Sequence, residues 1–472
     1  MNTDEKSSFW LIMSAVFFGN FLAVLSITTI NVAFPVVMEQ FHTTLSTTQW
    51  LMAGYLLATG IVAPIVGYMG DQLSYKRLFV LALTGFTLSS LLCVVAWNIE
   101  TLIAFRITQG VFGGMIIPIT MTIIYQVFPR ERQAYAMGLW SLASMLAPVI
   151  GPTLGGWLVQ YFGWKSIFIL NVPIGLISIV IVSKFIPFYR LTGKKTFDLL
   201  GFLTVVAGSS CLLLSFSHGN DWGWGSWKTI SLLVAGILLL LFFIKWELRI
   251  PSPLLQLKVF KFPRFRYSLI LNCIVTISLY TGTLLVPLYL QTVLKLSPMD
   301  TGLIMLPGAI VMAAASPIIG KFYDRIGPFR LVITGVLIIV AATLAFSGIG
   351  TNTSVLYIST LQLVRCLGIA LCNMPLTNAA MSAVSSEYSG HASSITNWAR
   401  QGLASLSIGI FSALVVTRTS YYMGAGAVTS RTATTMGIDD VFMIGTMVAV
   451  VAIPLTFLLR VKKEKSTRHV AL

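Results

Sequence analysis

The chain has 472 residues, of which 56% are hydrophobic and only 10% are charged, and its mean hydropathy is +0.87. A soluble domain usually carries about 25% charged residues, so this composition excludes an ordinary soluble fold and indicates a surface that faces lipid. The formal net charge of +16 does not indicate nucleic-acid binding, because the basic residues are scattered between apolar runs instead of forming one patch.

Fourteen apolar runs follow one another along the chain, each long enough for the roughly 20 residues that cross about 30 Å of hydrocarbon. The first begins at Trp10 with no small-residue cleavage site, so we expect it to remain as a span. The expected spans are 10–34, 49–69, 78–97, 101–125, 134–160, 165–187, 199–217, 228–246, 267–290, 301–322, 331–349, 354–379, 391–417 and 439–460.

The basic residues are distributed unevenly between these runs. With the N-terminus inside, 23 of the 31 Lys and Arg residues fall in cytoplasmic segments, five in external segments and three inside spans. Because cytoplasmic loops of membrane proteins carry an excess of Lys and Arg, the bias predicts a multi-pass protein of the cell membrane with both termini in the cytoplasm.

Two short signatures occur twice. GYMGDQLSYKR (Gly67 to Arg77) is echoed 253 positions later by GKFYDRIGPFR, which starts at Gly320, and RITQG at Arg106 is echoed by RCLG at Arg365. Parallel repeats in a polytopic chain indicate two similar bundles related about the membrane normal. We therefore predict an all-α membrane protein with a six-helix bundle over 1–190, two inserted helices over 191–262, a second six-helix bundle over 263–460 and a basic tail over 461–472.

Several further motifs stand in a fixed order: NVAFP at 31–35, QWLMAGYLL at 49–57, WKSIFILNVPIG at 164–175, FDLLG at 197–201 and PLYLQTVLKLSPMDTGLIMLPG at 287–308. Together they resemble the major facilitator superfamily, in particular its fourteen-helix drug/proton antiporter branch. The resemblance implies a secondary transporter that exports small amphiphilic compounds by alternating access. It implies no cofactor beyond the proton gradient, and partners limited to substrates, protons and membrane lipids around a monomer.

The repeated Gly-x-x-x-Asp motif resembles the gating motif of this family, in which glycine permits close helix contact and the aspartate pairs across the gate with a basic group or a helix N-terminus. The first copy departs from the family pattern at Gln72, Ser74 and Tyr75. An ordinary charged turn is the alternative. The expected gating residues are Gly67, Asp71, Lys76 and Arg77 in the first copy, and Gly320, Asp324 and Arg325 in the second.

Arg106 and Gln109 resemble a fourth-helix motif that the family uses in proton coupling, and Asp71 is a third candidate for that role. A charge inside the membrane is costly unless paired or hydrated; the alternative is an arginine that snorkels to the outer interface. A fifth-helix motif associated with antiporters has small residues that permit close packing and prolines that permit a bend. Its residues here are Gly138, Gly151, Pro152, Gly155 and Gly156.

Proton-coupled relatives commonly have an aspartate in the first span where this chain has Ser26, and no acidic residue lies in the middle of an expected span. Three arginines leave the interior positive, so we expect neutral, zwitterionic or anionic amphiphiles as substrates and not dications. Polar residues on the expected cavity-lining spans serve either as substrate contacts or as bonds between helices. They are Ser26, Asn31, Tyr55, Asn272, Tyr280, Asn373, Asn397 and Arg400.

Other classes of protein fit less well. The five cysteines and four histidines show no metal-ligand spacing, no ATP-binding motif is present and no nucleophile–base pair falls within a span, so neither an intramembrane enzyme nor a metalloprotein is expected. A receptor or scaffold would leave the repeats unexplained. Within transport, an exporter or flippase of a lipid or metabolite, or an uncoupled facilitator, remains open.

Overall fold

The computed structural model describes residues 3–43, 45–48, 50–188, 198–250, 253–296, 298–424 and 429–460, and every regular element in these ranges is a helix. The α-helices are α1 (Thr3–Phe41), α2 (Leu45–Thr48), α3 (Trp50–Val62), α4 (Val66–Leu73), α5 (Tyr75–Val94), α6 (Ile99–Val127), α7 (Arg130–Phe162), α8 (Ser166–Ile169), α9 (Asn171–Phe185), α10 (Leu199–Trp222), α11 (Trp227–Glu247), α12 (Pro263–Thr292), α13 (Pro298–Ile326), α14 (Pro328–Phe346), α15 (Val355–Met381), α16 (Ser389–Gly424) and α17 (Ser430–Thr456). The 3-10 helices are η1 (Ala63–Ile65), η2 (Leu257–Lys261), η3 (Ser386–Tyr388) and η4 (Phe457–Leu459).

Thirteen described helical segments are long and apolar enough to cross a membrane, and they coincide with all the expected spans except the fifth. The fifth, expected at 134–160, falls within α7, a continuous helix of 33 residues that is not among the thirteen. The prediction of an all-helical, multi-pass membrane fold is therefore confirmed. The total of fourteen spans stays a prediction.

Two spans differ from their predicted form. The second is interrupted at η1, because Pro64 lacks a backbone N–H and disturbs the regular helical bonding there. Helix α17 begins at Ser430 and not at 439, so the predicted start was wrong, and Asp439 and Asp440 lie in the third turn of a helix instead of at its end. The predicted linker residues 191–197 and the tail 461–472 lie outside the described residues.

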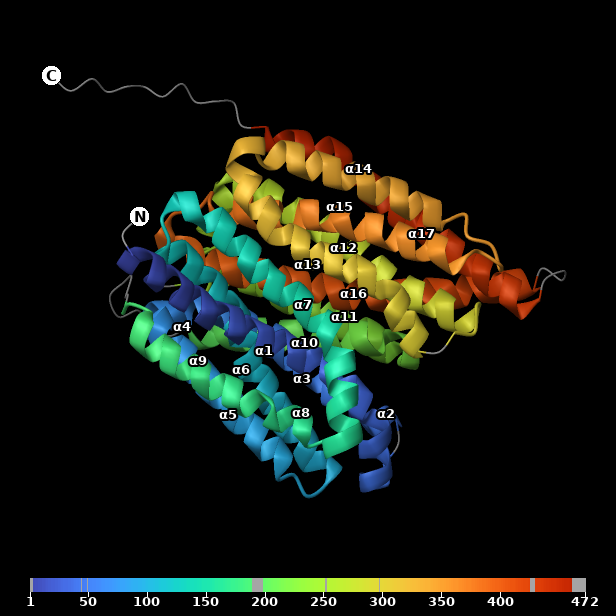
Figure 1. Ribbon diagram of the computed structural model, residues 1–472, viewed down its shortest axis with the longest axis horizontal. Helices are drawn as coiled ribbons and strands as arrows, with labels where there is room; N and C mark the ends of the chain where they lie inside the picture. Colours follow the sequence, from blue (N-terminus) through green and yellow to red (C-terminus); the bar gives the residue numbers. More distant parts are fainter. Residues whose placement is uncertain are drawn as a thin grey trace.

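The helices form two groups that meet along a central seam (Figure 1). Helices α1 to α9 make up the first bundle and α12 to α17 the second; α7 packs on α13 and α4 on α16 across the seam. Between them in sequence, α10 and α11 pack on each other, and α10 also lies against α3 and α16. One inserted helix therefore contacts both bundles.

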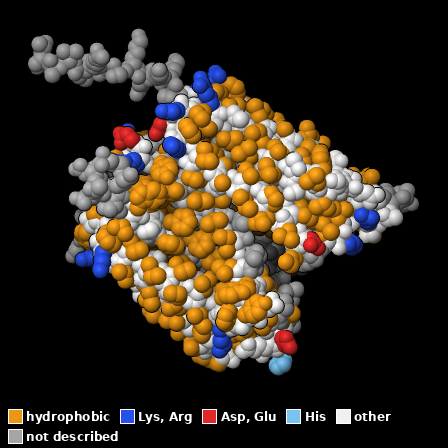
Figure 2. Space-filling view, in the orientation of Figure 1, with side chains coloured by type: hydrophobic (Ala, Val, Ile, Leu, Met, Phe, Trp, Pro, Cys, Tyr) orange, Lys and Arg blue, Asp and Glu red, His pale blue; other side chains and the backbone are white. Residues whose placement is uncertain are grey.

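Both ends of the described chain lie at the same end of the molecule (Figure 1). We call it the basic end, because the helices that start there carry Lys76, Arg77, Arg130, Arg264 and Arg330 close to their first residues. Figure 2 shows lysine and arginine side chains gathered along this edge, beside a broad apolar surface. The arrangement is typical of a protein whose apolar belt lies in lipid and whose basic loops lie in water.

The buried apolar side chains fall into clusters that differ at the two ends. The largest joins both bundles near the basic end and includes Tyr68 from α4 and Tyr323 from α13. Toward the opposite end each bundle has a cluster of its own, around Trp164 in the first and Phe442 in the second. The bundles are therefore packed together at the basic end and packed separately at the opposite end.

Candidate functional site

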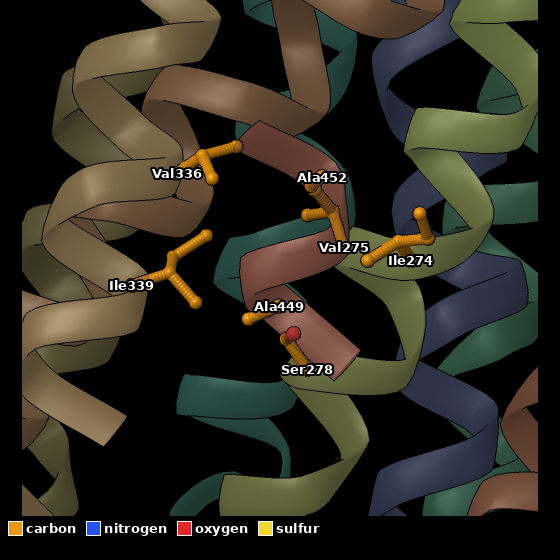
Figure 3. Close-up of a pocket in the computed structure, with 7 residues that line it drawn as sticks. All are labelled: Ile274, Val275, Ser278, Val336, Ile339, Ala449 and Ala452. Atoms are coloured by element: carbon orange, nitrogen blue, oxygen red, sulfur yellow. The ribbon is translucent and has the colours of Figure 1, made fainter. Parts of the chain in front are cut away.

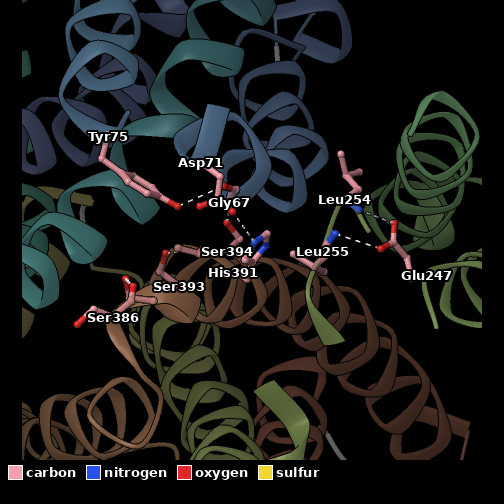
Figure 4. Close-up of polar contacts among 12 residues, drawn as sticks. Gly67, Asp71, Tyr75, Glu247, Leu254, Leu255, Ser386, His391, Ser393 and Ser394 are labelled. Carbon is pink, nitrogen blue, oxygen red and sulfur yellow. Dashed lines mark hydrogen bonds and ion pairs between the residues drawn. The ribbon is translucent and has the colours of Figure 1, made fainter. Parts of the chain in front are cut away.

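The first copy of the repeated motif meets the second bundle through a buried ion pair. Asp71, in the last turn of α4, is 2% exposed, and its Oδ2 lies 3.1 Å from Nε2 of His391, which is 1% exposed (Figure 4). His391 is the third residue of α16, so the carboxylate also lies beside the positive end of that helix dipole. Both kinds of partner expected for Asp71, a basic group and a helix N-terminus, are present at once.

Gly67 allows this close approach. A Cβ at this position would lie 3.1 Å from both the backbone nitrogen and the Cα of His391, closer than side chains normally pack. The Gly67 N–H donates to Ser394 Oγ at 3.1 Å, and its carbonyl oxygen accepts from the Tyr75 hydroxyl at 3.2 Å. The glycine thus allows α4 to pack directly against the first turns of α16.

More hydrogen bonds between the bundles continue from this contact. The hydroxyls of Thr122 on α6 and Ser393 on α16 lie 2.7 Å apart, and Ser393 also donates to the Pro118 carbonyl oxygen at 3.1 Å. The Tyr125 hydroxyl donates to Asn378 Oδ1 on α15 at 2.7 Å. These contacts and the Asp71–His391 pair form what we call the basic-end seam, a buried polar interface that separation of the bundles would expose to water.

The segment that leads from the inserted helices into α12 lies beside this seam (Figure 4). Glu247, at the end of α11, accepts from the backbone N–H groups of Leu254 and Leu255 at 3.2 Å each. Both leucine side chains are buried in the cluster that joins the bundles. The linker therefore takes part in the packing that joins the two bundles at the basic end.

The second copy of the motif keeps the helix contact without the ion pair. A Cβ on Gly320 would lie 2.6 Å from the Ala134 carbonyl oxygen, and one on Gly138 would lie 2.8 Å from the Ser316 carbonyl oxygen, so both glycines serve the same α7–α13 contact. Asp324 is exposed, and no described residue forms a hydrogen bond or ion pair with it.

The other basic residues of the two motifs lie at the surface. The Arg77 guanidinium lies 5.0 Å from the centre of the Phe188 ring, Lys76 is half-buried beside it, and Arg325 is exposed. These side chains surround the seam without joining it.

Arg106 is fully buried among three helices of the first bundle. Its Nε donates to the Leu51 carbonyl oxygen at 3.1 Å and its Nη1 to Ser26 Oγ at 2.6 Å, and the guanidinium also bonds to the Ser26 carbonyl oxygen and to Gln109 Oε1. The Tyr55 ring centre lies 4.4 Å from the guanidinium carbon. The snorkelling alternative is therefore wrong, and Ser26 binds directly to the charge that an aspartate there would neutralise.

Arg365 repeats this arrangement in the second bundle. It is fully buried, donates from Nε to Thr343 Oγ1 at 3.3 Å and bonds from Nη2 to the Ser278 carbonyl oxygen on α12. In the described chain all the recorded partners of both arginines are neutral, so each bundle holds a positive charge bound only by dipoles. Ser278 also borders a narrow, otherwise apolar gap between α12, α14 and α17 that is too small to hold a water molecule (Figure 3).

Apart from Gly138, which lies against α13, the glycines of the fifth-helix motif lie against the first helix. A Cβ on Gly155 would lie 3.2 Å from Cα of Thr29, one on Gly151 would meet the Thr28 side chain, and one on Gly156 would approach Val32 at 3.6 Å. The motif thus brings α7 close to α1. Pro152 and Asn31 lie on these helices, and their side chains are outside the described set.

The model of the Major Facilitator Superfamily matches residues 16–409, most of the chain. The chain belongs to this superfamily. Members of the superfamily are transporters, so the protein is a transporter and not an enzyme. The resemblance inferred from the motifs is confirmed at the level of the superfamily.

Superfamily relatives align over most of the chain. The MFS-type transporter YhcA of Bacillus subtilis is 34% identical over 89% of this chain and 79% of its own length. The multidrug resistance protein B homolog of Mycobacterium tuberculosis is 31% identical over 84% of this chain and 74% of its own. The crystal structure of the human transporter MFSD10 matches the fold with a TM-score of 0.64 over 93% of this chain and 99% of that one, at 13% identity.

The remaining candidates for the substrate cavity differ in whether their polar groups already form hydrogen bonds within the protein. Asn272 Nδ2 donates to Thr377 Oγ1 at 3.0 Å, which satisfies it inside its own bundle, and Asn373 and Tyr280 are half-buried. Asn397 on α16 is buried, and its Nδ2 has no recorded partner. One turn later on α16, Arg400 forms no recorded hydrogen bond with a described residue. These two are the best candidates to hold a polar group of a substrate.

Sequence reasoning missed His391. The four histidines are dispersed along the chain, and the partner of His391, Asp71, is 320 residues away in the sequence. The one available signal was its place near the predicted start of a span at 391, where a helix N-terminus opposite Asp71 was already expected.

Proposed function

We propose that the protein is a secondary active exporter of small amphiphilic compounds that works by alternating access and proton antiport. The proposal takes its substrate class from relatives at about 30% identity whose names refer to multidrug transport and antibiotic resistance. It includes fourteen spans and cytoplasmic termini. In its support, α7 has 33 residues and would extend about 50 Å, and both described chain ends lie at the basic end.

The observation that carries the proposal is the asymmetry between the two ends. The bundles share one apolar cluster and the buried Asp71–His391 pair at the basic end, while each has its own cluster at the opposite end. This is the arrangement expected of one state of a rocking two-bundle transporter. If the basic end faces the cytoplasm, the state is closed inside, and substrate loading requires the basic-end seam to open.

Substrate and proton would act on different groups. Asn397 and Arg400 offer an amide and a cation to a neutral, zwitterionic or anionic substrate, in keeping with the positive interior. Asp71 and His391 lie on different bundles, so proton coupling would act through this buried contact, which holds the two bundles together on the inner side. Arg106, held by Ser26 and Gln109, would keep α1, α3 and α6 together as the bundles move.

The proposal is tested by efflux from bacterial cells whose own exporters have been deleted. Cells that express the protein should lose a preloaded amphiphilic dye faster than cells with the empty vector, and a protonophore should abolish the difference. The Asp71→Ala variant should slow efflux strongly, and Asp324→Ala should leave it at the wild-type rate. Efflux that persists at full rate with the protonophore would instead indicate an uncoupled facilitator, and no efflux of any amphiphile by well-expressed protein would refute export.

A further inference from the structure

An apolar pocket lies under the inserted helix α10, where this helix crosses from one bundle to the other. Its cavity volume is about 240 Å³, and Gly60, Leu213, Phe216, Trp398, Gly402 and Leu406 are among its walls, between α3, α10 and α16. This is below the roughly 300–1,000 Å³ of sites that hold drug-sized ligands, so the pocket suits a slender occupant. Neither the gating motif nor the arginine networks contribute to it.

The pocket offers almost nothing polar to a ligand. Its tryptophan is already satisfied, because Trp398 Nε1 donates to Ser209 Oγ on α10 at 3.0 Å. The other lining side chains are hydrocarbon or phenyl, together with two glycines. Such a space stays free of water, because a buried water needs two to four polar partners.

The pocket is also separate from the polar candidates on the same helix. Trp398, Gly402 and Leu406 are four residues apart and share one face of α16. Arg400 is two residues from both Trp398 and Gly402, which at about 100° per residue places it on another side of the helix. Helix α16 therefore presents an apolar face toward α10 and a polar face toward the second bundle.

The helices that form the pocket indicate its occupant. Its walls belong to segments Trp50–Leu73, Leu199–Phe216 and Ser386–Gly424, all apolar enough to cross a membrane. Hydrocarbon chains of lipids surround such segments, and several wall residues, such as Trp398 and Leu406, are partly exposed and so reachable from outside. We propose that the pocket binds one acyl chain of a bilayer phospholipid, which fills the space between α10 and the seam of the two bundles.

A bound chain would lie between parts that move. Helix α10 approaches the first bundle where a Cβ on Gly60 would lie 2.7 Å from Leu213, and the second bundle where a Cβ on Gly409 would lie 2.7 Å from the Phe216 carbonyl oxygen. The acyl chain therefore fills the space between α3 and α16, and it can leave this space when the two helices move.

Photo-crosslinking tests the proposal on the full-length protein in nanodiscs of phosphatidylcholine that carries a diazirine in the middle of one acyl chain. Adducts should form on peptides that contain residues 209–216 and 398–406. The Gly402→Phe variant should lose them, because a Cβ at Gly402 meets no atom within 4 Å and the ring can enter the pocket. Gly302→Phe is the matched control: it also meets no atom within 4 Å but lies exposed on α13, and it should keep them.

Size-exclusion profiles and thermal unfolding establish that the variants are folded, and Leu406→Trp is a second filling variant from another position of the pocket. Loss of the adducts in a folded filling variant, with adducts retained in Gly302→Phe, supports the proposal. Equal labelling of wild type and both filling variants would overturn it. Displacement of the label by an exported amphiphile would also overturn it, since the pocket would then belong to the substrate path.

Discussion

Replacing Asp71 by asparagine should shift the protein toward opening at the basic end. Asparagine keeps the size of the side chain and an acceptor oxygen for His391, so only the charged character of the 3.1 Å contact is lost. A hydrogen bond to a charged group contributes about 1.5–3 kcal/mol and a neutral one about 0.5–1.5 kcal/mol. The difference of about 1–2 kcal/mol changes the ratio of closed to open molecules by a factor of about 5–30.

The shift is measured by double electron–electron resonance between spin labels at Leu73→Cys and Ser385→Cys, two exposed positions at the basic end of different bundles. The five native cysteines, three of them buried, are first replaced. The wild-type protein should give mainly a short distance, and Asp71→Asn should add a longer component. Asp71→Ala removes the partner of His391 entirely and should open the end further, by about 3–5 kcal/mol.

Asp324→Asn is the matched control, because Asp324 occupies the equivalent position of the second motif but is exposed and bonds to no described residue. An exposed site of this kind should change the equilibrium by no more than about 0.5 kcal/mol. Distance distributions that are the same for wild type and Asp71→Asn, or a larger shift in Asp324→Asn, would refute the assignment of the inner closure to the Asp71–His391 pair.

Three further predictions follow from single contacts. Arg106→Lys should reduce export more than thermal stability, with a stability loss of about 1–3 kcal/mol, because lysine cannot reproduce the fork of bonds to neutral acceptors; dye-efflux rates and thermal unfolding check this. Gly320→Ala should destabilise by about 1–3 kcal/mol through its clash with the Ala134 carbonyl oxygen, whereas Gly402→Ala, which meets no atom within 4 Å, should not lower the melting temperature. Arg400→Gln should raise the KM for anionic amphiphiles and leave that for neutral ones unchanged; equal effects on both would argue against a substrate contact.

The helices and their order were accessible from the sequence, because a membrane span imposes a long apolar run on every helix that faces lipid. The sequence also predicted that Gly67 permits close contact between two helices, but it did not identify α16 as the second helix. The interruption at Pro64 and the early start of α17 at Ser430 were not predicted. Hydropathy averages over many residues, so it hides a single turn of irregular helix and the polar first turns of a long one.

The sequence did not predict which side chains of one bundle contact which side chains of the other. The repeat placed both Asp71 and Asp324 among the expected gating residues. The structure repeats only the glycine contact, because the partner of Asp71 is a histidine on α16 that has no counterpart in the repeat. Arg106 was correctly singled out as an unusual charge, yet its bonds to Leu51 and Ser26 depend on how three helices pack. Side-chain networks are set by that packing, which one sequence does not specify.

Transport by the purified protein in liposomes of known lipid composition tests the central claim, proton-driven export by rocking of two bundles. A neutral or anionic fluorescent amphiphile should move against its gradient when a pH gradient is imposed, and collapse of the pH gradient should stop accumulation. The Asp71→Ala variant should uncouple or slow the movement, while Asp324→Ala should behave like the wild type. Failure of every pH gradient to drive accumulation, by protein that is folded and inserted, would contradict the account.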